Sequence, residues 1–192
     1  MAVNVPNYNT SNISFGPGIL YASAWSGTTP PATPSTVAGN DIGAISEDGI
    51  TVELTSDKRY IAQGNPRLNI FGVSQVQSAN VSCTGIEWNV DTFKNAIGAG
   101  TAASGTDPQT FAWGGDPSCV EIGITIKHRQ INGFFIYIHV WKAVSESGFS
   151  IPLGQDEHSF EYRWTALHSA VNFADDPIVG DGNLIYISRN TA

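Results

Sequence analysis

The four histidines are the residues best suited to acid–base or metal chemistry in this sequence, and their spacing favours neither. They are His128, His139, His158 and His168. No two have the four-residue helical spacing of a zinc site, and no Cys-x-x-Cys pair accompanies them. The sequence also lacks a Gly-x-Ser-x-Gly segment and a phosphate-binding glycine loop. We therefore expect structural or surface histidines, no metal, no cofactor and no enzymatic activity.

Acidic side chains occur in three adjacent pairs, at Glu47-Asp48, Asp156-Glu157 and Asp175-Asp176. Each pair falls in a predicted turn, where Asp is favoured because its side chain bonds to nearby backbone amides. Calcium binding stays open for these carboxylates, although none has the spacing of a helix–loop–helix calcium loop.

The composition predicts an all-β protein. Only 14% of the 192 residues are charged, whereas Gly (20) and Pro (10) are frequent. The net charge of −8 argues against a surface that grips nucleic acid, which needs clustered Lys and Arg. No apolar run is long enough to span a membrane and no signal-like segment opens the chain, so we expect a soluble, non-secreted protein. Cys83 and Cys119 could pair, but burial as small apolar residues is favoured.

The elements that must position any functional residue centre on an antiparallel meander from 119 to 169. In its first strand Val120, Ile122, Ile124 and Ile126 alternate with polar residues, which predicts one buried and one exposed face. Asn132-Gly133 supplies a tight turn, and Phe134–Val144 and Ser159–Leu167 form the next two strands.

The rest of the chain divides into predicted segments around this meander. They are a flexible arm at 1–14, one domain at 15–188, a Pro/Thr-rich loop at 26–40, a strand at 50–61, a loop at 63–72 with exposed Leu68, Ile70 and Phe71, a strand at 73–88 with a bulge at Gly85, a loop at 100–117, a closing strand at 184–188 and a tail at 189–192.

One short helix is predicted after the long strand. Val90, Phe93 and Ile97 have helical spacing, Asn89 or Asp91 is the N-cap, and Gly98 ends the helix. The strand at 134–144 is apolar on both sides, with Phe135, Tyr137 and Trp141 on one of them. Such a strand must be covered on both faces, either by this helix or by a neighbouring subunit.

Several short segments of the sequence, in this order, resemble the major tail protein, or tail tube protein, of long-tailed (siphovirus-type) bacteriophages over residues 15–188. The segments are Phe15-Gly-Pro-Gly-Ile-Leu-Tyr21, Asp41-Ile-Gly-Ala-Ile-Ser-Glu-Asp-Gly-Ile-Thr-Val52, Gly85-Ile-Glu-Trp88, Ser145-Glu-Ser-Gly148, Phe160-Glu-Tyr-Arg-Trp-Thr-Ala-Leu167 and Gly182-Asn-Leu-Ile-Tyr-Ile187. The Pro-rich loop at 28–34 and the Gly/Ala-rich stretch at 98–106 depart from that family.

The resemblance implies a fold, an assembly and a set of partners. The fold is a mainly β, antiparallel β-sandwich or barrel with one short flanking α-helix. Its inner sheet completes a β-barrel across a hexameric ring, and rings stack into a tube in the virion after assembly in the host cytoplasm. The implied partners are further copies, the tape-measure, tail-terminator and baseplate or hub proteins, and genomic DNA that passes through the bore during ejection without specific binding.

The physical properties of the sequence agree with a tube. Four strands from each of six subunits, spaced ~4.8 Å and tilted ~40°, close a barrel roughly 48 Å across. A net charge of −8 per copy gives 6 × −8 = −48 per ring, which repels DNA phosphates.

Strand parity predicts which side chains face the bore, although an ordinary solvated sheet face has the same alternation. The predicted lumen residues are Thr51, Glu53, Thr55, Asn80, Ser82, Thr84, Glu121 and Thr125. By the resemblance, Leu68, Ile70 and Phe71 stack one ring on the next.

The alternative function is that of a carbohydrate- or receptor-binding β-sandwich, for virion decoration or adhesion. Trp25, Trp113 and Trp164 would then form a sugar-binding platform. A hydrolase on a jelly roll is disfavoured because the histidines are scattered.

Overall fold

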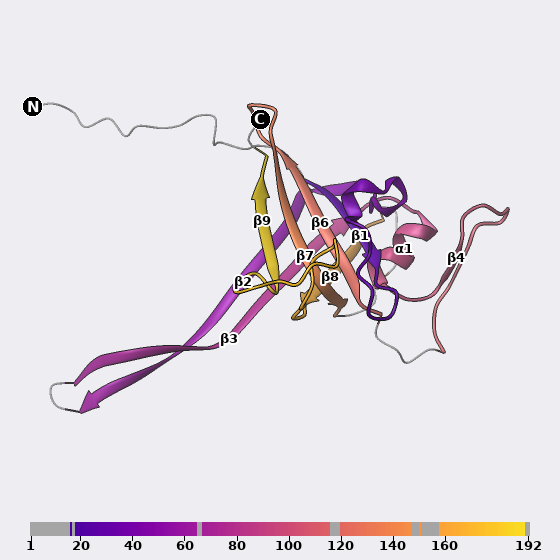
Figure 1. Ribbon diagram of the computed structural model, residues 1–192. Coiled ribbons are helices and arrows are strands. Elements are labelled where there is room, and N and C mark those ends of the chain that lie inside the picture. The colour runs from indigo at the N-terminus through magenta and orange to yellow at the C-terminus, as the bar shows by residue number, and fades with distance from the viewer. Residues whose placement is uncertain are drawn as a thin grey trace, which may run out of the picture.

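A curled antiparallel sheet forms half of a barrel and holds most of the chain (Figure 1). The computed structural model describes residues 16, 18–64, 67–115, 120–146, 150 and 158–190. Its strands are β1 (Ile19–Ala24), β2 (Ile45–Gly64), β3 (Arg67–Gly85), β4 (Thr101–Ala103), β5 (Thr110–Ala112), β6 (Ile122–Arg129), β7 (Phe135–Ser145), β8 (Phe160–Ala166) and β9 (Ile185–Arg189). One α-helix, α1 (Val90–Ile97), and two 3-10 turns, η2 (Pro34–Thr36) and η3 (Ala38–Asn40), are the helical elements of these residues. The predicted mainly β fold with one short helix is confirmed.

The order of the strands in the main sheet is β1-β6-β7-β8-β3-β2, and β9 also pairs with β7. Residues Ala143–Ser145 of β7 pair with β8, whereas Ile136–Val140 pair with β9. Because β6 occupies the other edge of β7, β8 and β9 lie end to end along one edge. The segment 167–184 separates them as an excursion from the sheet.

The predicted meander is present as β6, β7 and β8. The turn between β6 and β7 is closed by a hydrogen bond from the Gln130 amide to the Phe134 carbonyl (2.8 Å). Gly133 has a φ of 87°, which an L side chain rarely adopts, whereas Asn132 does not have a positive φ, so the predicted turn is present but only the glycine of the Asn-Gly pair supplies the positive φ.

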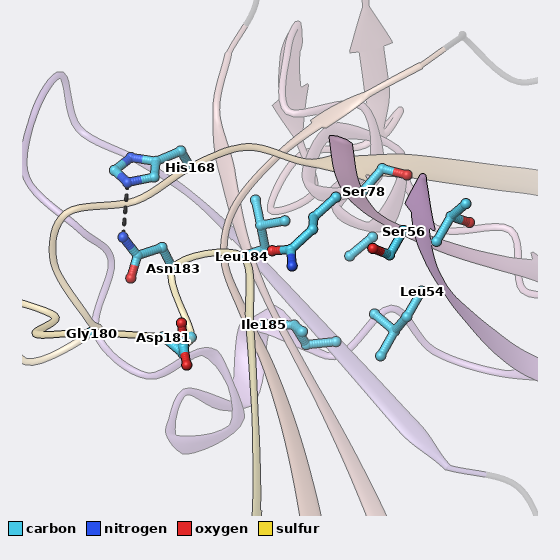
Figure 2. A pocket seen from close by; sticks show the side chains of 13 residues that line it. Leu54, Ser56, Ser78, His168, Gly180, Asp181, Asn183, Leu184 and Ile185 are labelled. Carbon is cyan, nitrogen blue, oxygen red and sulfur yellow. Dashed lines mark hydrogen bonds between the residues drawn. The ribbon is translucent and has the colours of Figure 1, made fainter. Parts of the chain in front are cut away.

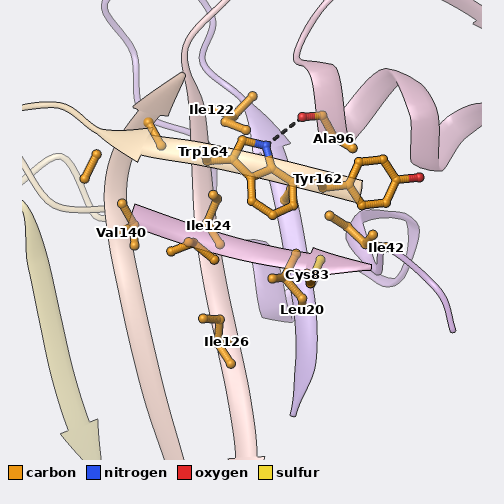
Figure 3. Packing of buried hydrophobic residues seen from close by; sticks show 14 of the residues in the cluster. Leu20, Ile42, Cys83, Ala96, Ile122, Ile124, Ile126, Val140, Tyr162 and Trp164 are labelled. Atoms are coloured by element: carbon orange, nitrogen blue, oxygen red, sulfur yellow. Dashed lines mark hydrogen bonds between the residues drawn. The ribbon is translucent and has the colours of Figure 1, made fainter. Parts of the chain in front are cut away.

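The core lies on the concave side of the sheet, under α1 (Figure 3). Ile122, Ile124 and Ile126 project into it from β6, and Trp164 projects into it from β8. The helix adds Phe93, which is buried and packs edge-on against Phe160. Since α1 has only eight residues, burial of this apolar face rather than intrinsic propensity stabilises it.

The ends of α1 match the predicted caps. The Asn89 side chain accepts a hydrogen bond from the Asp91 amide (2.9 Å), which identifies Asn89 as the N-cap. Gly98 has a φ of 71° and its amide donates to the Lys94 carbonyl (2.8 Å). A Cβ at Gly98 would lie 2.8 Å from Ile122 Cγ2, so both conformation and space require glycine.

The longest feature of the fold is a two-stranded ribbon in which β2 and β3 continue far beyond the core (Figure 1). From Glu53 onward every residue of β2 is exposed. We call residues Thr55–Gly64 and Arg67–Ser78 the arm; at ~3.3 Å per residue it projects about 30 Å. The arm corrects two predictions, because β2 exceeds 50–61 and the predicted loop at 63–72 is instead the distal end of two strands. Exposed apolar residues there reflect a ribbon that has left the core, not a loop.

Register shifts bend the ribbon at three places. Two lie within the arm, where β3 has one extra residue between Ser74 and Val76 and another between Asn69 and Phe71. The third lies at Gly85, where a bulge was predicted. Its extra residues, however, are on β2, between Ile45 and Ile50.

Two further predictions need correction or lie outside the described residues. The predicted loop at 100–117 contains a small hairpin, in which β4 pairs with β5. Three predicted features fall outside the described residues: the flexible N-terminal segment at 1–14, Cys119 and the pair Asp156-Glu157. Among the described residues, no helix is long and apolar enough to cross a membrane.

Candidate assembly surface

One continuous polar surface crosses the convex side of β2, β3 and β8. The register places Thr51 opposite Ser82 and Glu53 opposite Asn80. Partners that face each other across an antiparallel ladder project to the same side of the sheet. We call this set the polar face; it comprises Thr51, Glu53, Asn80, Ser82, Thr84, Glu161, Arg163 and Thr165.

Six of the predicted lumen residues therefore lie on one side of the β2–β3 ladder, since Thr55, opposite Ser78, continues this row onto the arm. The β8 residues of the polar face were absent from the predicted set. The alternation in Phe160–Ala166 could have identified them, because Glu161, Arg163 and Thr165 occupy its polar positions.

The polar face carries more negative than positive charge. Arg163 Nε lies 3.6 Å from the carboxylate of Glu146, and the Thr165 hydroxyl donates to that carboxylate as well. Glu53 and Glu161 add two further carboxylates, so the polar face and the adjacent Glu146 together carry three acidic groups and one guanidinium. Such a surface disfavours contact with phosphate.

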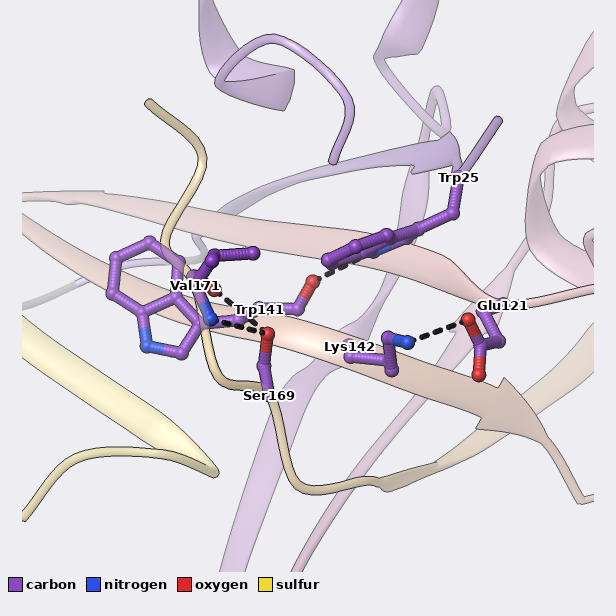
Figure 4. A network of polar contacts seen from close by, with 6 residues as sticks. All are labelled: Trp25, Glu121, Trp141, Lys142, Ser169 and Val171. Carbon is purple, nitrogen blue, oxygen red and sulfur yellow. Dashed lines mark hydrogen bonds and ion pairs between the residues drawn. The ribbon is translucent and has the colours of Figure 1, made fainter. Parts of the chain in front are cut away.

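The last two predicted lumen residues lie apart from the polar face, over β6. Thr125 is fully buried and lies 3.0 Å from His139 Nδ1, so it cannot line a lumen and that prediction is wrong. Glu121 forms an ion pair with Lys142 (2.7 Å) (Figure 4). A bulge in β7 opposite Gly123 brings Lys142 to this side of the sheet, where its ammonium group lies 4.4 Å from the centre of the Trp25 ring.

The convex side of β7 carries a row of aromatic rings. Tyr137, His139 and Trp141 stack with interplanar angles of 6° and 10°, and Phe135 extends the row. The helix does not cover this row, because α1 packs on the concave side. A loop and β9 contribute the cover instead: Phe173 packs edge-on against Trp141, and Tyr186 stacks on His139.

The predicted stacking residues lie on the distal part of the arm. Phe71 is 61% exposed, whereas the side chains of Leu68 and Ile70 lie outside the described residues. On the same side of the ribbon Phe71 has three exposed apolar companions. We call this set the apolar stripe; it comprises Ile61, Phe71, Val73 and Val76.

A groove of about 710 Å³ lies where the arm leaves the body (Figure 2). The arm base supplies one wall with Leu54, and the other wall is the segment 180–185, from which Ile185 points across toward Leu54. This second wall is firmly held, because the Gly182 carbonyl accepts a hydrogen bond from Trp141 Nε1 (2.9 Å) and Asn183 lies 2.8 Å from His168. Asp181 is the acidic residue of the lining.

Potential metal ligands do not cluster among the described residues. No group of three or more His, Cys, Asp or Glu side chains that could hold a metal occurs among them. Burial raises the pKa of the free Cys83 thiol to about 12, so the thiolate that does nucleophilic chemistry is disfavoured.

The tryptophan platform of the alternative function is not formed. Trp164 and Trp25 are buried, and their indole N–H groups donate to the carbonyls of Ala96 (2.6 Å) and Trp141 (2.9 Å). Of the three, only Trp113 is exposed, at 66%. A sugar-stacking surface built from these residues is therefore ruled out.

No family model and no curated protein matches the chain. The tube-terminating cap of the anti-feeding prophage is similar over 99% of this chain and 95% of that chain, with 10% identity and a TM-score of 0.47. A chain from the tail of an empty gene transfer agent particle, refined with C6 symmetry, is similar over 78% of this chain and 92% of that chain, with 13% identity and a TM-score of 0.39. Both neighbours are components of tail-like particles.

Proposed function

We propose that this chain is a structural, non-enzymatic subunit of a bacteriophage tail tube, a major tail protein that forms stacked hexameric rings around a conduit for DNA. The observation that carries the proposal is the set of unpaired strand edges. Among the described residues, β2 pairs only with β3, the outer edge of β9 has no partner strand, and β3 has none on its second side from Arg67 to Ala79. Long exposed edges invite pairing with other chains, and closure of a ring satisfies them.

The polar face supports an orientation of the subunit in this ring. Small hydroxyl and amide groups with a negative balance form a surface along which DNA slides without being retained. We therefore assign the polar face to the lumen and the aromatic row on β7, with its covering loop, to a position away from it.

The arm supports stacking. It projects from the core and carries exposed apolar residues. Soluble monomers rarely expose such residues as a continuous patch. Contact with the next ring covers these residues, as proposed for Phe71. The tape-measure, tail-terminator and baseplate or hub proteins are the expected further partners, and the virion tail is the expected location.

Negative-stain electron microscopy of the purified protein, with light scattering over a concentration series, tests the proposal. Hollow rings or tubes with six-fold symmetry are the expected result. A monodisperse monomer at every concentration, which also fails to add to isolated tail-tube ends, contradicts it.

A further inference from the structure

The hydrophobic core is not closed on every side by its own strands and α1. A hollow of about 510 Å³ reaches it between β2, β6 and β7. The apolar lining of this hollow consists of Ile50, Val52, Ile126 and Ile138. Three of these side chains, Ile50, Val52 and Ile138, pack against the core but are only partly buried. Since removal of such surface from water is favourable, a segment that covers the hollow would stabilise the fold.

The hollow lies at the seam between the two edge strands of the curled sheet. β1 and β2 are at opposite ends of the strand order, but the curl brings them together. The Ile42 amide, just before β2, donates to the Leu20 carbonyl in β1 (3.0 Å). Just before β1, a Cβ atom on Gly18 would lie 3.1 Å from Ile126 Cγ2 and 3.3 Å from Ile50 Cδ1. The chain therefore enters β1 directly along the apolar lining.

The part of the chain that precedes β1 starts at the rim of the hollow. Gly16 and Gly18 both belong to its lining. Gly16 has a φ of 91°, a conformation that lets the chain turn and that other residues rarely adopt. The 15 residues before it reach about 50 Å when extended. The lining along β2, from Glu47 to Val52, covers only about 17 Å, so this segment is long enough to cover the hollow.

The residues next to the rim have the pattern that an apolar site requires. Asn12-Ile13-Ser14-Phe15 alternates polar and apolar side chains. In an extended segment alternate side chains share a face, so Ile13 and Phe15 can enter the hollow together while Ser14 faces solvent. Residues 1–15 contain no Asp, Glu, Lys or Arg, so no charged side chain loses its water on docking.

The point of attachment favours this segment over any part of a second copy. A segment joined at the rim meets the hollow at an effective concentration on the order of millimolar. A second copy would in addition lose translational and rotational freedom on binding. Length, alternation and attachment point therefore indicate the same occupant.

We propose that the N-terminal segment of the same chain docks in this hollow, with Ile13 and Phe15 packed against Ile126 and Ile138, and completes the cover of the core. The contact lies on the concave side of the sheet. It leaves the polar face, the arm and the outer edge of β9 free, so the inference goes beyond the proposed function and does not depend on it.

Photo-cross-linking tests the docking directly. The full chain is prepared with the benzophenone amino acid p-benzoylphenylalanine in place of Phe15, and an equal mixture of isotope-labelled and unlabelled protein is irradiated. Peptide mapping should place the attachment in β6, in β7 or at residues 50–52 of the same chain, in products that carry a single isotope composition. Products that join a labelled to an unlabelled chain, attachment elsewhere or no attachment overturn the inference. The isotope mixture separates the two kinds of product whether or not tubes form.

Polar substitutions provide a second measurement. Ile13→Asn and Phe15→Asn should each undock the segment and leave the fold intact. The fluorescence of anilinonaphthalene sulfonate, a dye that binds exposed apolar surface, should therefore rise severalfold. Ser14→Asn, at the intervening position, is the matched control and should leave the dye fluorescence at the wild-type level. If neither apolar substitution raises the fluorescence above that of Ser14→Asn, the inference is wrong.

Discussion

The indole N–H of Trp164 donates a hydrogen bond to the carbonyl of Ala96 across 2.6 Å, and this contact joins β8 to the last turn of α1. Carbonyls in the last turn of a helix have no partner within the helix. Trp164 therefore satisfies a polar group of α1 while its ring fills the centre of the core, where it is fully buried.

Replacement of Trp164 should destabilise the fold. Trp164→Phe removes the donor and leaves the Ala96 carbonyl buried without its partner, so we expect a loss of about 1–3 kcal/mol in the free energy of unfolding. Urea denaturation followed by circular dichroism measures the loss. Trp113→Phe, at an exposed position, should change the free energy of unfolding by less than about 0.5 kcal/mol. Equal effects of the two substitutions would contradict the assignment.

Acidification should destabilise the protein through His139. Burial lowers the pKa of its imidazole below the ordinary value of 6.5. The unfolded chain therefore binds a proton at a higher pH than the folded chain does. The stabilisation from the neutral ring is fully present above pH 6.5 and declines as the pH falls from there toward the folded pKa.

The double variant Thr125→Val/His139→Phe tests this pH dependence. It keeps a ring in the aromatic row and removes the hydroxyl that faces His139 Nδ1, so no buried polar group loses its partner. Between about pH 7 and pH 5, the midpoint of urea unfolding should fall less in the variant than in the wild type. Parallel curves for the two proteins would show that His139 does not titrate in this range.

The apolar stripe should be needed for assembly and not for folding. Ile61→Asp and Phe71→Asp place charges at positions outside the core, so thermal unfolding should stay within a few degrees of the wild type. Rings and tubes should be lost, because the buried contact would then contain an unpaired carboxylate. Ile131→Asp, at a turn residue that is 62% exposed, is the control. Tubes from Phe71→Asp at wild-type concentrations would exclude the stripe from the contact.

Reversal of charge on the polar face should convert a passive lumen into one that holds DNA. Glu53→Lys/Glu161→Lys changes the face by four charge units per subunit while both side chains stay on the solvent side of the sheet. Tubes of this variant should retain double-stranded DNA at low salt and release it steeply as salt rises. Filter retention with end-labelled DNA measures this. If the variant tubes retained no more DNA than wild-type tubes, the polar face would not line the lumen.

Local patterns predicted the elements that a few neighbouring residues determine. Alternation identified β6 and β8, and a run that is apolar on both sides identified β7. Asn132-Gly133 identified the turn, and the cap residues Asn89 and Gly98 set the ends of α1. Each depends on backbone chemistry within a few residues, which the sequence contains directly.

Properties that depend on distant segments were not accessible in the same way. The bulge opposite Gly123 decides that Lys142 reaches Glu121, and no local pattern indicates it. Thr125 has the parity of an exposed residue, yet His139 and the covering loop bury it. The arm was missed for a related reason, since exposed apolar residues are typical of loops as well as of ribbons that leave a core.

The orientation of the polar face in an assembled tube is the most direct test of the proposed function. A cryo-electron microscopy reconstruction of tubes from the purified protein, at a resolution that traces strands, measures it. We predict a six-fold tube in which the convex side of β2, β3 and β8 lines the bore, with Glu53 and Ser82 toward the axis. A tube with this face on its exterior, or with the aromatic row of β7 in the bore, would contradict the assignment.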